Sequence, residues 1–184
     1  MGCRYALITN LWQTSTAKRL GFEACGDLRL GICNGESAAE TADIGLERFI
    51  VSSEARKSPA AVIPRGQIIY GALPVMTLEK CTIREICGAK LPPISACRYC
   101  DTHRFSYLCD RLGVKFPMAR EYKHRNVIFN SVPVYMGDKK SGMDCEFYHY
   151  IFTNESCAEI DRIIGITEKG KNYGGKFCRL SSPK

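Results

Sequence analysis

Three short apolar runs occur in the first part of the chain, and the first two end in polar residues. They are RYALITN at residues 4–10, ERFIVSSE at 47–54 and QIIYGALPVM at 67–76. Such short runs are typical of buried strands. The segments between the first two, STAKRLGF and NGESAAETADIGL, resemble helices, and Asn34 or Ser37 provides a cap for the second. This alternation predicts parallel βα units.

The pattern changes after residue 76. Residues 77–109 contain the Pro92-Pro93 pair and no sustained period, which predicts a loop. Residues 126–138, NVIFNSVPVYMGD, return to a strand or buried-turn pattern that Pro133 interrupts. The chain therefore gains a second, less regular region after its βα units.

The stretch FYHYIFTNESCAEIDRIIGI predicts an aromatic strand followed by a helix that starts within residues 153–156. Ile160, Ile163 and Ile164 recur at helical spacing, so they form the apolar face of an amphipathic helix. An α/β fold follows from these elements together.

The 184 residues are 45% hydrophobic and 24% charged, which suits one globular domain. No apolar run is long enough to span a membrane and no secretory signal opens the chain, so a cytoplasmic protein without a membrane partner is expected. The formal net charge of +7 permits contact with RNA, although scattered lysines and arginines favour a solvated basic surface.

Eleven cysteines are present, and five of them fall between residues 81 and 111. Their odd number and the absence of a secretory signal favour metal ligation or buried thiols over disulfides. Five others stand alone, and we expect them to be buried thiols; they are Cys3, Cys25, Cys33, Cys157 and Cys178.

Cys97 and Cys100 form a C-x2-C unit, which binds one metal centre without backbone strain. Cys81 and Cys87 lie close enough upstream to complete four thiolate ligands. Zinc and an iron–sulfur cluster both accept such a set. A zinc ribbon has two C-x2-C pairs, whereas Cys81 and Cys87 do not form such a pair, which favours iron and sulfide. Cys109 suits a core position as well as a ligand position.

Several motifs follow one another in a recognisable order: YGALPVM at residues 70–76, KCTI at 80–83, Cys97 with Cys100, DRLG with FP at 110–117, and NSVPVYMGD at 130–138. The series resembles the collagenase-like peptidase family of unknown catalytic type, peptidase family U thirty-two. Thr82 departs from this family, which usually has proline there.

The resemblance implies a partial (β/α)8-like, TIM-type barrel, of which this chain holds the C-terminal part. Residues 1–76 then supply the closing βα units, and residues 77–184 supply the Cys-rich loop and a C-terminal α+β segment of the same domain. A complete barrel needs about 250 residues. We therefore expect self-association, or a partner that supplies the missing strands.

The resemblance also implies function: peptidase (hydrolase) activity, or oxygen-independent hydroxylation of RNA or a small aromatic by means of a [4Fe-4S] cluster. Cys81, Cys97 and Cys100 are the implied ligands. Cys87 is the nearest fourth ligand, with zinc as the alternative metal. The fourth position stays open to three further residues, Cys109, Cys145 and His124.

The chain contains no HExxH motif and no G-x-S-x-G elbow, so no known protease type is recognisable. His103 and His124 suit exposed loops, and His149 suits a packed strand. Three functions stay open. The chain is a peptidase acting on a peptide, an iron–sulfur enzyme acting on RNA or a small aromatic, or a non-catalytic fragment held by a metal. Four residues are candidates for a substrate cleft: Asp110, Arg111, Asn130 and Tyr135. For Asp110 and Arg111, pairing with each other is the favoured interpretation.

Overall fold

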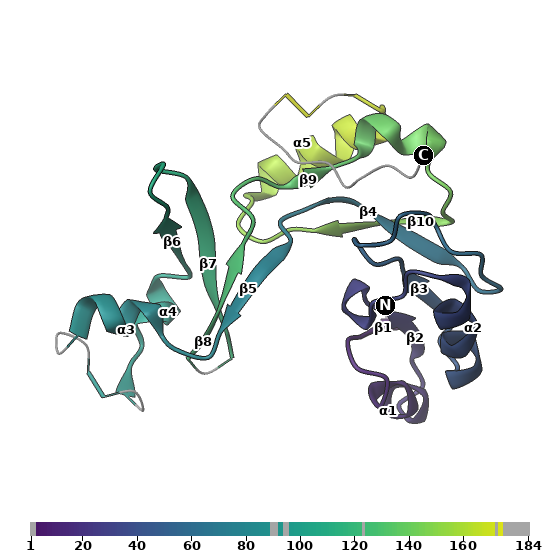
Figure 1. Cartoon of the computed structure of the whole chain (residues 1–184), viewed down its shortest axis with the longest axis horizontal. Coiled ribbons are helices and arrows are strands. Elements are labelled where there is room, and N and C mark those ends of the chain that lie inside the picture. The colour runs from purple at the N-terminus through teal and green to yellow at the C-terminus, as the bar shows by residue number, and fades with distance from the viewer. Residues whose placement is uncertain (1–2, 89–91, 94–95, 123, 172, 175–184) are drawn as a thin grey trace.

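A computed structural model describes residues 3–88, 92–93, 96–122, 124–171 and 173–174, and its main body is an α/β unit (Figure 1). Five strands pair in parallel in the order β1-β2-β3-β4-β10. The strands are β1 (Tyr5–Ile8), β2 (Glu23–Gly26), β3 (Arg48–Ile50), β4 (Arg65–Gly71) and β10 (Phe147–Ile151). The predicted α/β class is confirmed.

Helices connect and cover this sheet. α1 (Gln13–Arg19) joins β1 to β2, and the 3₁₀ turn η1 (Leu28–Leu30) and α2 (Gly35–Ile44) join β2 to β3. The predicted cap is confirmed, because Asn34 accepts a hydrogen bond of 2.8 Å from the Ser37 amide. β2 was not predicted from the sequence, because its segment Glu23–Gly26 shows neither an extended apolar run nor an alternating pattern.

A second, antiparallel sheet is inserted between β4 and β10 and forms a separate limb in Figure 1. Its order is β5-β8-β7-β6. The strands are β5 (Pro74–Leu78), β6 (Phe105–Cys109), β7 (Lys115–Tyr122) and β8 (Arg125–Phe129). The run at 67–76 is thus two strands in two sheets, because the chain leaves the parallel sheet after Gly71.

Two short helices, α3 (Thr82–Cys87) and α4 (Tyr99–Thr102), lie at the far end of this limb (Figure 1). The prediction that residues 77–109 form only a loop was therefore wrong. Ile83, Met118 and Ile128 form a small core beneath the helices. Packing against the antiparallel sheet stabilises segments that have no recognisable period of their own.

The chain returns to the main body through β9 (Val134–Tyr135), which pairs antiparallel with β4, and the 3₁₀ segment η4 (Gly137–Gly142). α5 (Cys157–Glu168) then packs over β4 and β10, with Ile163 fully buried. Ser156 and Glu159 form a capping box at its start, which confirms the predicted helix start.

The parallel sheet is open: β1 and β10 are its two edges in the described part of the chain, and no closed barrel is formed there. Gly71 lies at a close approach between β4 and β10, where a Cβ atom would stand 2.6 Å from Cβ of Ile151. Only glycine fits at this contact. No helix among the described residues is long and apolar enough to cross a membrane.

Candidate functional site

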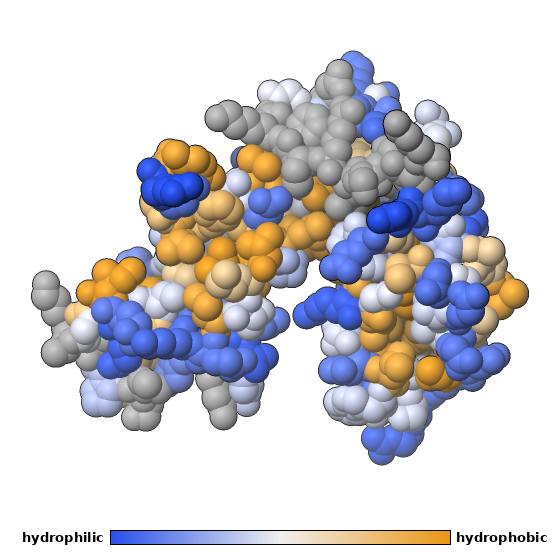
Figure 2. Space-filling view, in the orientation of Figure 1, coloured by the Kyte–Doolittle hydropathy of each residue, from blue (hydrophilic) through white to orange (hydrophobic). Residues whose placement is uncertain are grey.

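A cleft of about 540 Å³ lies between the two sheets, and Figure 2 shows the molecule hollowed there. Its walls come from both sheets because the chain turns away from β4 at residues 72–74. Apolar side chains form much of its surface, including Leu7, Ile151, Val127 and Phe129. A concave, mainly apolar hollow with a few polar groups is the usual form of a ligand site.

Polar groups cross this cleft. Asp27, which directly follows β2, is 2% exposed and accepts a 2.5 Å hydrogen bond from Nε of Arg29. Nη1 of Arg29 in turn lies 3.8 Å from Oε1 of Glu121, which belongs to β7 of the other sheet. The buried Asp27 carboxylate therefore fixes an arginine that reaches from one sheet to the other.

His149 of β10 also lines the cleft. Burial lowers the pKa of His149 from its usual 6.5, while the carboxylate of Asp27 acts in the opposite direction. A neutral imidazole facing a hollow is able to accept a proton at neutral pH. From the sequence, His149 was predicted only as a packed strand residue, because a strand pattern does not show which face borders a cleft.

A second, much smaller pocket contains the predicted thiols. Its volume is about 10 Å³, and its lining residues come from the start of α3, from α4 and its approach, and from β7 and β8 with the turn between them. They are Cys81, Cys97, Cys100, Arg120, His124 and Asn126. Three of the four predicted thiol ligands thus share one pocket.

The environment of Cys100 reflects this crowding. Burial raises the pKa of the Cys100 thiol, Arg120 opposes the shift, and the thiols of Cys81 and Cys97 reinforce it. Neighbouring thiols resist ionising together because their negative charges repel. A bound cation removes that repulsion, which is why clustered thiols are good metal ligands.

The antiparallel sheet separates the cleft from this thiol pocket. Along β8, Arg125, Val127 and Phe129 line the cleft, while Asn126 lines the thiol pocket and Ile128 packs beneath α3 and α4. This alternation is the normal two-residue period of a strand. Arg120 of β7 borders both hollows and so connects them.

The donor set fits a soft metal or an iron–sulfur cluster, because it offers three thiols and an imidazole. Within the described ranges, no three His, Cys, Asp or Glu side chains are already spaced to hold one metal ion. The arrangement therefore gathers suitable donors without preassembling them.

Three of the four fourth-ligand candidates, Cys87, Cys109 and Cys145, lie outside this pocket. Cys87, the last residue of α3, packs against the small core of Ile83, Met118 and Ile128. Cys109 is exposed at the end of β6, and Cys145 lies beside the backbone of Gln67 in the parallel sheet. Of these candidates, His124 is the one that lines the thiol pocket.

Three of the residues expected to form a substrate cleft have other positions in the tertiary structure. Tyr135 is fully buried in the main core, and the Asn130 amide donates to the carbonyl of Leu73. Asp110 accepts hydrogen bonds from the amides of residues 112 and 114, so it shapes the β6–β7 turn. None of the three lines the cleft between the sheets.

Among the four isolated cysteines that the structure describes, Cys25 has the buried thiol that we predicted, whereas the side chains of Cys3, Cys33 and Cys157 are exposed. Cys178 lies outside the described residues. His103 is exposed and stacks on Tyr99, with the ring centroids 4.3 Å apart. Burial of a cysteine depends on its neighbours in space, so sequence context alone misjudged these positions.

No family model matches the chain, and neither a curated protein nor a solved structure is significantly similar to it. The site therefore rests on its own geometry. Sequence reasoning missed Asp27 and Arg29, although a polar residue directly after an apolar strand is a usable signal. It also missed Arg120 and Asn126, whose roles depend on which strand face they occupy.

Proposed function

We propose that this chain is a redox protein related to the collagenase-like peptidases, in which Cys81, Cys97 and Cys100 hold an iron–sulfur cluster. The observation that carries the proposal is that these three thiols, from two separate segments, line a single pocket. A cluster held there supplies one-electron transfer. The open parallel sheet then corresponds to the closing part of a TIM-type barrel.

The cleft between the sheets is the proposed substrate site. It has room for a small aromatic molecule or a single base, consistent with oxygen-independent hydroxylation of such a ring. Arg29 and Arg120 offer N–H donors to the polar groups of a substrate, and the neutral imidazole of His149 offers a proton acceptor. Arg120 borders the thiol pocket as well, so it links the bound substrate to the redox centre.

Peptide hydrolysis in the same cleft is the second candidate. It is favoured by His149, a half-buried imidazole whose ring experiences the charge of the buried Asp27 carboxylate. A neutral imidazole near a carboxylate is able to serve as a general base toward water. This activity needs no metal at the thiol pocket, which separates the two candidates experimentally.

The test is anaerobic purification followed by analysis of iron, sulfide and zinc per chain. We expect a brown protein with near-stoichiometric iron and sulfide, and a loss of both in Cys81→Ser, Cys97→Ser and Cys100→Ser. Cys33→Ser and Cys157→Ser, which alter exposed thiols, are the matched controls. Zinc without iron would favour a structural metal, and absence of every metal would overturn the proposal. Gelatin cleavage that survives metal removal would establish the hydrolase.

A further inference from the structure

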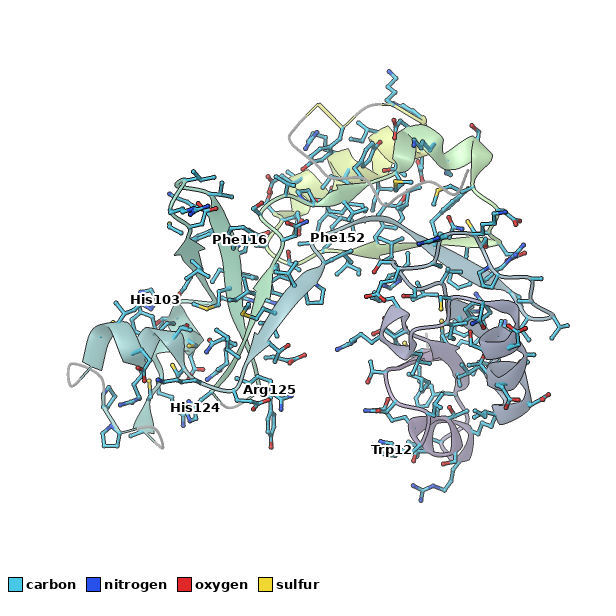
Figure 3. The ribbon with its side chains drawn as sticks, in the orientation of Figure 1. Trp12, His103, Phe116, His124, Arg125 and Phe152 are labelled. Atoms are coloured by element: carbon cyan, nitrogen blue, oxygen red, sulfur yellow. The ribbon has the colours of Figure 1, made fainter. Side chains whose placement is uncertain are left out.

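We infer that the fourth ligand of the thiol pocket is the imidazole of His124, so that the centre has three thiolates and one histidine. This inference rests on the proposed cluster at Cys81, Cys97 and Cys100. His124 lies at the turn between β7 and β8, and Figure 3 shows it beside the segment that carries α3 and α4. It is half-buried and lines the same pocket as the three thiols.

The side chain of Asn126 fixes His124 relative to Cys81. Asn126 is 2% exposed, and its Nδ2 donates to the carbonyl of Lys80 at 2.8 Å and to the carbonyl of His124 at 3.1 Å. Lys80 directly precedes Cys81. One buried amide group thus joins the backbone segments of both proposed ligands, as outer partners of metal sites commonly do.

Cys87 is the competing donor, and its surroundings differ from those of Cys81. Both cysteines contact the small apolar core beneath α3, but only Cys81 also lines the thiol pocket. Cys81 precedes the first residue of the helix and Cys87 is its last residue, so they lie at opposite ends of α3. A thiol that packs against an apolar core and is not among the residues that line the donor pocket behaves as a normal core residue.

An imidazole in place of a thiolate changes the charge of the centre. A neutral nitrogen ligand leaves one negative charge fewer than a set of four thiolates, and histidine ligation raises the reduction potential of iron–sulfur clusters. Arg120 in the pocket wall adds positive charge and acts in the same direction. A centre of this kind accepts an electron more readily than one with four thiolates.

The experiment compares His124→Cys, His124→Ala and Cys87→Ala after anaerobic reconstitution with iron and sulfide. The readouts are iron per chain, the midpoint potential, and nitrogen hyperfine coupling in the electron spin echo of the reduced cluster. In wild type we expect the nitrogen coupling. His124→Cys keeps the iron, loses the coupling and has a lower potential. His124→Ala loses iron affinity by about 10-fold or more.

Cys87→Ala is the matched control and is expected to keep iron, coupling and potential as in wild type. Far-ultraviolet circular dichroism verifies that each variant is folded. If Cys87→Ala loses the cluster while both His124 variants retain wild-type spectra, the inference is overturned and the cluster proposal stands. If wild type itself binds no iron, the proposed function fails before the ligand question arises.

Discussion

Arg120 of β7 donates a hydrogen bond of 2.7 Å to Asp101, the residue that follows Cys100 in α4. The contact ties the short helix that carries a proposed ligand to β7, an inner strand of the antiparallel sheet. Both side chains are more than a third exposed, so the ion pair contributes only about 0.2 to 1 kcal/mol to stability. Its main effect is to fix the position of α4 relative to β7.

Arg120→Gln is therefore expected to change the free energy of unfolding by less than about 1 kcal/mol while it weakens metal retention about 10-fold. The measurements are urea unfolding and iron per chain after exposure to a chelator. Arg98→Gln removes the other, more exposed partner of Asp101 and provides the control. Equal effects of the two variants on metal retention would refute a positioning role for Arg120.

Because His149 is half-buried, we expect the free energy of unfolding to fall as the pH is lowered. Its folded-state pKa is lowered, so the unfolded chain takes up a proton at a pH at which the folded chain does not. The stabilisation is complete above the usual value of 6.5 and declines as the pH falls below it. We expect His149→Gln to flatten the decline measured by urea unfolding between about pH 7.5 and about pH 5.5.

His103→Gln, which replaces an exposed imidazole, is the comparison for that experiment. A decline of the same slope in wild type and His149→Gln would show that another group governs the acid response.

The close approach at Gly71 predicts a sharp difference between two glycines. Gly71→Ala forces β10 away from β4, because the new Cβ would meet both side-chain and backbone atoms of Ile151, and we expect destabilisation by about 1 to 3 kcal/mol. Gly165→Ala meets nothing within 4 Å in the middle of α5 and should stabilise by about 0.5 to 1 kcal/mol. Thermal unfolding of both variants measures this; a neutral Gly71→Ala would contradict the packing described.

The open edge at β1 predicts self-association. Leu11 and Trp12 beyond this strand are exposed, with 69% of Trp12 accessible, and an unpaired edge strand favours pairing with another chain. Sedimentation should show association that grows with protein concentration and weakens in Trp12→Ser. Leu112→Ser, at the distant β6–β7 turn, should leave it unchanged. A monomer at every concentration would refute this prediction.

Several features of this protein could be predicted from the order of its amino acids: the α/β class, the capped helices that start after Asn34 and Ser156, and the thiol-rich segment near Cys97 and Cys100. These features are local, because caps, apolar runs and close cysteine spacing act within a few residues. The strand at 23–26 and the division of residues 67–76 between two sheets could not be predicted, because short strands are defined by their pairing partners.

The set of donors that share a pocket became apparent only in the folded chain. Cys81 and His124 are 43 positions apart in the sequence and are joined through Asn126, whose buried amide bonds both backbone segments. Cys87, much nearer to Cys81 in sequence, packs into a core without reaching the pocket. The side on which a residue lies follows from strand pairing and helix packing, and both depend on contacts between distant parts of the chain.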